Sequence, residues 1–254
     1  MAALDGRTAL VTGASRGIGE AVALALAGQG ARVVLVARGE EALRRVAARI
    51  EASGGACEVL PLDVTDRDDA ARAVAEWTEV AGPVEVLVNA AGWNVRRRAD
   101  EYGLDEWDAL VAVHLTAPFH WARLVLPGMR EAGFGRIVNV ASVAGLTALP
   151  SGAPYGAAKA GMIHLTRVLA REWGPHGITV NAVAPWYVRT ELSEPVLSDA
   201  AFLAKVLAAT PARRIGTVED VASAVAFLCG HDAGWINGVC LPIDGGFSAA
   251  SFWP

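Results

Sequence analysis

Short runs of β-branched residues alternate with longer alanine- and leucine-rich stretches along the chain, and this alternation limits the possible folds most strongly. It is typical of βαβ units and a parallel sheet. Runs such as Val33–Val36 are apolar at every position, as expected of strands covered on both faces. We therefore expect an α/β fold, a doubly wound parallel sheet of about seven strands with helices on both faces. The expected strands are Thr8–Thr12, Arg32–Ala37, Cys57–Leu60, Val84–Asn89, Arg136–Val140, Thr179–Val183 and Val239–Ile243.

Length and even composition indicate a single domain over residues 1–254. The 254 residues can bury one sizeable core, and no linker, repeat or low-complexity tract divides them. Residues 190–214 depart from the regular alternation, because they hold Pro195, Pro211 and only a short amphipathic piece. Ligands bind beyond the carboxyl ends of strands in such sheets, so we expect residues 190–214 to form a substrate lid. A surface excursion without a role is the alternative.

Charge and cysteine spacing argue against two classes of partner. The net charge of −5 gives no basic excess to attract a phosphate backbone, so no nucleic acid is expected. Cys57, Cys229 and Cys240 lie far apart and the five histidines form no H-E-x-x-H pattern, so no metal site is expected. The thiols are most simply buried in a reducing compartment.

The mean hydropathy of +0.35 raises the question of a membrane span. The most apolar stretch, Ala21–Ala37, is interrupted by Gly28-Gln29-Gly30. It lacks the roughly 18 uninterrupted apolar residues that a spanning helix needs. The first residues carry Asp5 and Arg7, so no signal peptide is expected. We expect a cytoplasmic protein with no membrane partner.

A glycine-rich turn follows the first expected strand and precedes a helical pattern. Glycine permits a tight turn and lets backbone N–H groups approach a pyrophosphate at the positive end of the helix. The turn predicts a dinucleotide site, although glycines at such a turn can also serve close packing alone. Its residues are Thr12-Gly13-Ala14-Ser15-Arg16-Gly17-Ile18-Gly19.

Two arginines near this turn bear on the choice of cofactor. In NAD-binding sheets an acidic side chain at the end of the second strand holds the ribose 2′-hydroxyl, whereas an arginine there accommodates a 2′-phosphate. Here the second strand ends at Arg38, and the first carboxylate after it is Glu40. With Arg16 in the glycine turn, two guanidiniums suit a phosphate dianion, so we expect NADP(H). The alternative is two solvated arginines.

Tyr155 and Lys159 open a helix that is expected to run to about Trp173. Their i,i+4 spacing puts the phenol and the ammonium on one helix face. A free tyrosine has a pKa of about 10, and an adjacent lysine favours the phenolate, which suits general acid or base work. Ser142, just past the fifth strand, has a hydroxyl suited to hold a carbonyl oxygen. Such a pair is commonly structural, so its meaning depends on the other motifs.

These motifs stand in the order found in one enzyme family. The chain also has Asp63-Val64, Asn89-Ala90-Ala91-Gly92, Pro185–Thr190 and Asp244-Gly245-Gly246. It thus resembles the short-chain dehydrogenase/reductases over essentially its whole length, and is expected to share their Rossmann-type fold. From its last third, including the tail Asp244–Pro254, it looks most like the tropinone-reductase-like members.

The resemblance implies roles for individual residues. Tyr155 would be the proton donor, Ser142 would orient the carbonyl, and Lys159 would also bind the nicotinamide ribose. Asp63 and Val64 would flank the adenine, Thr190 would hold the carboxamide, and the protein would be a homo-oligomer, a tetramer or a dimer. With the two arginines, the expected cofactor-binding residues are Gly13, Ser15, Arg16, Gly17, Ile18, Gly19, Arg38, Asp63, Val64, Asn89, Ala90, Gly92, Tyr155, Lys159, Pro185, Val188 and Thr190.

The chain departs from the family pattern at His114, where the family has a fourth catalytic residue, an asparagine that helps hold a relay water. Two interpretations stay open: the imidazole fills the space of the asparagine, or it joins the proton path as a candidate catalytic residue. Pro118 has no N–H for the carbonyl of His114, which predicts a kink and a free carbonyl for the relay water. Trp93 and Trp186 are expected to line the substrate pocket.

Three functions remain open from the sequence. The leading hypothesis is an NADPH-dependent reductase that acts on a small or medium apolar ketone, with a small molecule as its partner. The second is an NAD(P)-dependent alcohol or sugar-alcohol dehydrogenase that works oxidatively. The third is an NADP(H)-sensing binding protein with weak catalysis. The intact set of Ser142, Tyr155 and Lys159 favours an enzyme.

Overall fold

A computed structural model describes residues 3–149 and 152–249, so the end of the tail, residues 250–254, lies outside the described residues. Within them seven strands form one parallel sheet in the order β3-β2-β1-β4-β5-β6-β7, which confirms the expected fold class. The strands are β1 Thr8–Thr12, β2 Arg32–Ala37, β3 Ala56–Pro61, β4 Val86–Asn89, β5 Gly135–Val140, β6 Ile178–Pro185 and β7 Cys240–Ile243.

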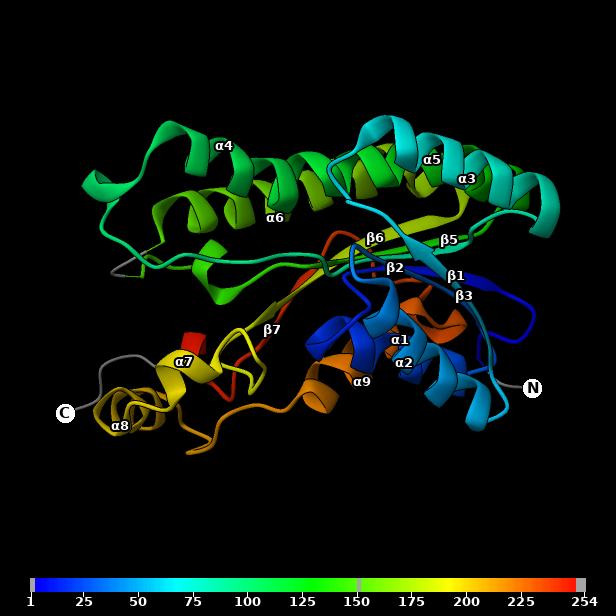
Figure 1. Cartoon of the computed structure of the whole chain (residues 1–254). Helices are drawn as coiled ribbons and strands as arrows, with labels where there is room; N and C mark the ends of the chain where they lie inside the picture. The colour runs from blue at the N-terminus through cyan, green and yellow to red at the C-terminus, as the bar shows by residue number, and fades with distance from the viewer. Residues whose placement is uncertain (1–2, 150–151, 250–254) are drawn as a thin grey trace.

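Helices cover both faces of the sheet (Figure 1). One layer holds α3, α4, α5 and α6, the other holds α1, α2 and α9, and α7 and α8 lie together at the lower left of the view. The helices are α1 Gly17–Gly28, α2 Glu40–Ala52, α3 Arg67–Ala81, α4 Leu104–Val111, α5 Ala117–Ala132, α6 Ala153–Trp173, α7 Glu194–Leu197, α8 Ala200–Ala209 and α9 Val218–Cys229.

Strand β2 shows why its apolar run does not alternate with polar residues. Val33 and Leu35 pack into the core beneath α1, α2 and α9. Val34 and Val36 pack into the core on the opposite face, beneath α3 and α5. All four side chains are buried, because successive residues of a strand point to opposite faces.

Helices α3, α8 and α9 begin where the side chain of the N-cap residue accepts from free N–H groups. Asp66 accepts from the N–H of Asp69 at the start of α3, at 3.0 Å. Thr217 and Asp220 cap α9 reciprocally, each accepting from the backbone of the other. Such caps contribute about 1 kcal/mol each and fix where the helix starts.

A continuous helical run, Leu104–Ala132, has the length and the hydropathy of a membrane-crossing helix, with a mean of 1.3 in its most apolar window. In that window 44% of the residues are buried inside the protein. The run contacts α3, α6 and β5, as the core helix of a globular domain does.

A five-residue π-helical turn at Ala112–Thr116 joins α4 to α5. Pro118 explains the irregularity, because a proline cannot donate to the carbonyl of His114, four residues earlier. The N–H of Ala117 instead donates to the carbonyl of Ala112, five residues back. The irregularity expected near His114 is thus a widened turn within a continuous helical run.

The sheet reverses its winding between β1 and β4, and this reversal positions the site. The chain leaves β1 toward β2 and leaves β4 toward β5, so a crevice opens at the carboxyl ends of these two strands. There the hydroxyl of Thr12 accepts from the N–H groups of Ala90 and Ala91, at 3.1 and 3.3 Å. These bonds hold the two strand ends together beside the glycine turn.

Candidate active site

The glycine turn after β1 leaves no room for side chains at two positions. A Cβ on Gly13 would lie 2.7 Å from the backbone of Ala91, and Gly13 has a φ of +70°. A Cβ on Gly19 would overlap the carbonyl oxygen of Gly13. The turn therefore lies tightly against the end of β4, and its N–H groups sit at the start of α1. This geometry fits the pyrophosphate of a dinucleotide.

Arg16 and Arg38, the two arginines expected to bind the 2′-phosphate, both lie at the surface. Arg38 follows β2 directly and its guanidinium lies 3.8 Å from a carboxylate oxygen of Asp63. Arg16 forms an ion pair with Glu191, at 2.7 Å, and so bridges the glycine turn and the segment that follows Thr190. Both side chains are more than half exposed and open to an anion from solvent.

The loop that holds Asp63 and Val64 is fixed from the core. The indole of Trp121, fully buried on α5, donates to the carbonyl of Val64 at 3.1 Å. The carboxylate of Asp63 accepts from the backbone and the hydroxyl of Thr65. The loop thus has a fixed path at the carboxyl end of β3, next to Arg38.

A pocket of about 470 Å³ opens at the carboxyl ends of β4, β5 and β6. It collects all four candidate catalytic residues and eight of the seventeen expected cofactor-binding residues. The expected residues that line it are Ile18, Ala90, Gly92, His114, Ser142, Tyr155, Lys159, Pro185, Val188 and Thr190. Those that do not line it are Gly13, Ser15, Arg16, Gly17, Gly19, Arg38, Asp63, Val64 and Asn89.

Asn89 lies beneath the pocket rather than in its wall. Its amide donates to the side chain of Asn139 at 2.9 Å, and Asn139 in turn donates to the hydroxyl of Thr166 at 2.9 Å. All three side chains are buried. This chain of hydrogen bonds ties β4, β5 and α6 together below the catalytic candidates.

Ser142, Tyr155 and Lys159 meet at the centre of the pocket. Ser142 follows β5, and its hydroxyl accepts from the N–H of Ala144 at 3.1 Å. Tyr155 and Lys159 occupy one face of α6, with the ammonium 5.7 Å from the centre of the phenol ring. The ammonium donates to the carbonyl of Val140 at 2.6 Å, which fixes it at the end of β5.

Burial sets the protonation of this group. It raises the pKa of Tyr155, although a hydrogen bond from Ser142 and the charge of Arg96 oppose the rise. It lowers the pKa of Lys159 to about 7. Desolvation therefore sets the direction of the change in the pKa of Tyr155, which is opposite to the lowering expected from the lysine. Tyr155 is a neutral phenol near pH 7 and has a proton to give.

His114 lies against the tyrosine. Its ring meets that of Tyr155 edge to face, with centroids 4.9 Å apart. Its Nε2 lies 2.6 Å from the carbonyl oxygen of Trp93, and since a carbonyl only accepts, this nitrogen carries the proton. Its Nδ1 is then a bare acceptor, buried and without a partner among the described residues.

The imidazole of His114 is neutral across the physiological range. Burial and the charge of Lys159 lower its pKa to about 3, against the hydrogen bond to Trp93. With this pKa the ring carries no second proton between pH 6 and pH 8 and keeps only the one on Nε2, which is bonded to Trp93. The structure therefore favours the interpretation in which histidine fills the space of the family's asparagine, with Nδ1 as its one free acceptor.

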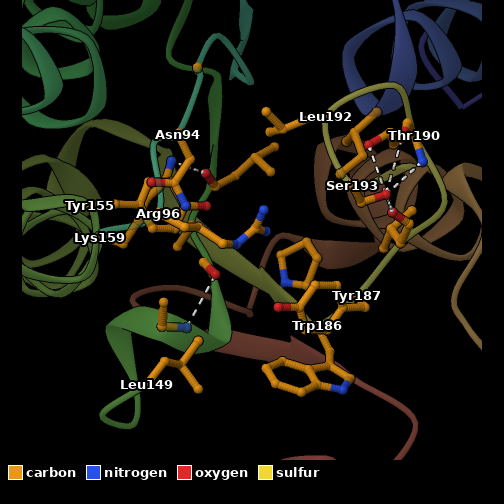
Figure 2. A pocket seen from close by; sticks show the side chains of 18 of the residues that line it. Asn94, Arg96, Leu149, Tyr155, Lys159, Trp186, Tyr187, Thr190, Leu192 and Ser193 are labelled. Atoms are coloured by element: carbon orange, nitrogen blue, oxygen red, sulfur yellow. Dashed lines mark hydrogen bonds between the residues drawn. The ribbon is translucent and has the colours of Figure 1, made fainter. Parts of the chain in front are cut away.

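Aromatic side chains form the far wall of the pocket (Figure 2). Trp186 and Trp93 both line it, as expected. Trp186 stacks on Phe247 with centroids 3.8 Å apart, and its indole donates to Thr210 at 3.2 Å. Six lining residues belong to the expected lid: Leu192, Ser193, Phe202, Lys205, Val206 and Ala209. The remaining lining residues, which were not among the expected site residues, are Ala91, Asn94, Arg96, Val140, Ala141, Ala144, Leu149, Tyr187 and Phe247.

The chain matches known proteins over nearly its whole length. A family model described as enoyl-(acyl carrier protein) reductase matches residues 13–248. A tropinone reductase homologue of Arabidopsis thaliana is 39% identical over 250 residues, which cover 98% of this chain and 95% of that protein.

Solved structures agree with these matches. A gluconate 5-dehydrogenase from Burkholderia cenocepacia, in complex with NADP and tartrate, is 37% identical with a TM-score of 0.94, covering 98% of this chain and 97% of its own. A short-chain type dehydrogenase/reductase from Mycobacterium marinum is 34% identical with a TM-score of 0.92 and covers 97% of both chains.

Proposed function

Since the chain belongs to the short-chain dehydrogenase/reductase family, we propose that it is an NADPH-dependent reductase of small or medium ketones. The observation that carries the proposal is the meeting of Ser142, Tyr155 and Lys159 in one pocket beside the glycine turn. The chain is an NADP-dependent oxidoreductase, and the structural relative with bound NADP shares its fold from end to end.

The chain provides a cradle that suits the cofactor. The glycine turn takes the pyrophosphate, because Gly13 and Gly19 keep the backbone free of side chains there. Arg38 and Arg16 take the 2′-phosphate, and Thr190 with Ile18 lies at the nicotinamide end. When bound, the reduced nicotinamide supplies a hydride to the carbonyl carbon.

Two side chains act on the carbonyl oxygen and a third acts on the tyrosine. The hydroxyl of Ser142 donates to this oxygen and orients it. The phenol of Tyr155 gives it a proton as negative charge develops, which the raised pKa of Tyr155 allows at neutral pH. The ammonium of Lys159 stabilises the phenolate that remains. A secondary alcohol forms, and the tyrosine is reprotonated from solvent.

The second candidate is the reverse reaction on an alcohol or a sugar alcohol. The structural relative named as a gluconate 5-dehydrogenase favours it. The aromatic wall of Trp186, Tyr187, Phe202 and Phe247 favours a substrate with an apolar body. The third candidate, a binding protein without turnover, would leave the ordered catalytic set unused.

Three features of the surroundings complete the proposal. Residues 190–214, which hold α7 and α8, form a lid, because Leu192, Phe202 and Val206 line the pocket.

The protein is a cytoplasmic homo-oligomer, a dimer or a tetramer. Trp235, 99% exposed, and Phe227, 51% exposed, support an interface. Light scattering after size-exclusion chromatography measures the oligomer, and a monomer at micromolar concentration would refute it.

Replacement of the proton donor tests the reductase. Tyr155→Phe should remove NADPH-dependent ketone turnover by a factor of at least 10² while NADPH binding stays nearly intact, because only the donated proton is lost. Turnover is followed by NADPH absorbance over a ketone panel, and binding by fluorescence titration. Substantial turnover in the variant would assign the proton transfer to another group.

A further inference from the structure

The pocket has a charge asymmetry that the reductase chemistry does not use. Among the described residues that line it are the cations Arg96, Lys159 and Lys205, and no aspartate or glutamate. Lys159 has its place beside Tyr155. Arg96, on the irregular segment after β4, and Lys205, on α8, have no role in the transfer of hydride or proton. A pocket of this kind attracts an anion.

Arg96 differs from the two arginines that follow it. The guanidinium of Arg97 pairs with Glu106 at 2.7 Å, and that of Arg98 pairs with Asp100 at 3.3 Å. Within residues 3–149 and 152–249 no carboxylate lies within ion-pair distance of Arg96. Arg96 is exposed like Arg97 and Arg98, but its side chain lines the pocket, whereas theirs pair with carboxylates.

The Arg96 side chain reaches into the pocket, between the Tyr155 side and the Tyr187 side (Figure 2). Its guanidinium carbon lies 5.8 Å from the centre of the Tyr187 ring. Its charge is near enough to act on the phenol of Tyr155. The guanidinium therefore lies at the same pocket as Ser142 and Tyr155, and it donates no hydrogen bond to another side chain or backbone group of the described residues.

We propose that Arg96 binds a carboxylate of the substrate, so that the substrate class is a keto acid, with a hydroxy acid as the product. This inference rests on the proposed reductase function and names the substrate class of the same pocket. A guanidinium holds a carboxylate by two parallel hydrogen bonds, which also fixes the orientation of the ketone toward Ser142 and Tyr155. Lys205 adds positive potential from the lid. A ketone with a cationic amine would meet only like charges.

Matched pairs of substrates test the inference by turnover. The methyl ketones 4-oxopentanoate, 5-oxohexanoate and 6-oxoheptanoate are compared with their methyl esters, which keep the ketone and remove the charge. For at least one length, the acid should exceed its ester in kcat/KM by about tenfold or more. Arg96→Gln should reduce this acid-to-ester ratio about tenfold, whereas the control Arg98→Gln should leave it within about twofold. The ratio is used because Arg96 also acts on Tyr155.

Binding of a non-reacting pair separates the inference from the reductase assignment. Hexanoate and hexanamide are titrated in the presence of NADP⁺, with the fluorescence of the pocket tryptophans as the signal. The protein should prefer hexanoate, and Arg96→Gln should abolish the preference. Preference for hexanoate without turnover of any ketone would overturn the reductase and leave the anion site standing. Ketone turnover with equal use of acid and ester, or a preference that survives in Arg96→Gln, would overturn the anion site alone.

Discussion

His114→Asn provides a quantitative test of the buried neutral imidazole. A histidine in the unfolded chain has a pKa of about 6.5, whereas burial holds the pKa of His114 at about 3 in the folded protein. The folded state therefore resists protonation that the unfolded state accepts. The contribution of this site to stability is complete above pH 6.5 and is lost progressively as the pH falls from 6.5 toward 3.

The size of the effect follows from the two pKa values. At pH 5 the pH lies about 1.5 units below the pKa of histidine in the unfolded chain, so this histidine is protonated there while the folded one is still neutral. The free energy of unfolding therefore falls by about 2 kcal/mol relative to pH 8. Asparagine does not titrate and loses nothing from this source. Lys159, whose pKa of about 7 also produces pH dependence, is present in both proteins.

Urea unfolding at pH 8 and pH 5 measures the difference, at one protein concentration for the wild type and for His114→Asn. Each protein is compared with itself, so a general loss of stability in the variant cancels. The wild type should lose about 2 kcal/mol more than the variant between the two pH values. Equal losses, within about 0.5 kcal/mol, would show that His114 protonates in the folded state and refute the argument.

His114→Asn and a second variant, Pro118→Ala, address the proton relay. With a neutral imidazole, His114→Asn should keep turnover within a few-fold of the wild type from pH 6 to pH 8, without removing an inflection from the pH–rate profile. Pro118→Ala restores a donor to the carbonyl of His114, straightens the π-helical turn and should slow turnover more. The opposite ranking of the two variants would make the imidazole a catalytic group.

Three further predictions concern the cofactor side and the packing of the site. Gly92→Ala places a Cβ 3.0 Å from Nδ1 of His114 and closer still to Cε1, so it should lower the free energy of unfolding by about 1–3 kcal/mol. In a double-mutant cycle measured by urea unfolding, His114→Asn should recover part of this loss, and additive losses would contradict the contact. Arg38→Asp should weaken NADPH binding by about 2 kcal/mol or more and NADH binding much less, whereas equal weakening in a titration would remove Arg38 from the 2′-phosphate site. Glu191→Gln releases Arg16 from its ion pair and should tighten NADPH binding a few-fold at low salt; unchanged affinity would separate Arg16 from the phosphate.

The sequence predicts the sheet well because its signals are local. The run Val33–Val36 indicates a strand buried on both faces, and a parallel sheet brings the carboxyl ends of its strands to one edge. That rule brings Ser142, which follows β5, and Ile18, which follows β1, to one pocket. The expected strand bounds differ from the observed ones by at most two residues at either end.

Other features depend on side-chain directions that no local pattern encodes. Arg96, Arg97 and Arg98 are indistinguishable in the sequence, and only the path of the chain after β4 directs the first of them into the pocket. Asn89 stands at a strand end like a ligand contact, yet its amide turns inward to Asn139. Burial, which reverses the expected direction of the tyrosine pKa, is likewise a property of the assembled fold.

The stacking of Trp186 on Phe247 has a consequence for how the specificity of this enzyme can change. Phe247 comes after the last strand, so one wall of the pocket is built by a segment far along the chain from Ser142, Tyr155 and Lys159, although all four line the same pocket. A substitution at residue 247 alters the volume next to the substrate without disturbing the hydrogen bonds that set the proton donor. Substrate range and chemistry are therefore carried by separable parts of the molecule, and selection or engineering can adapt one while the other stays intact.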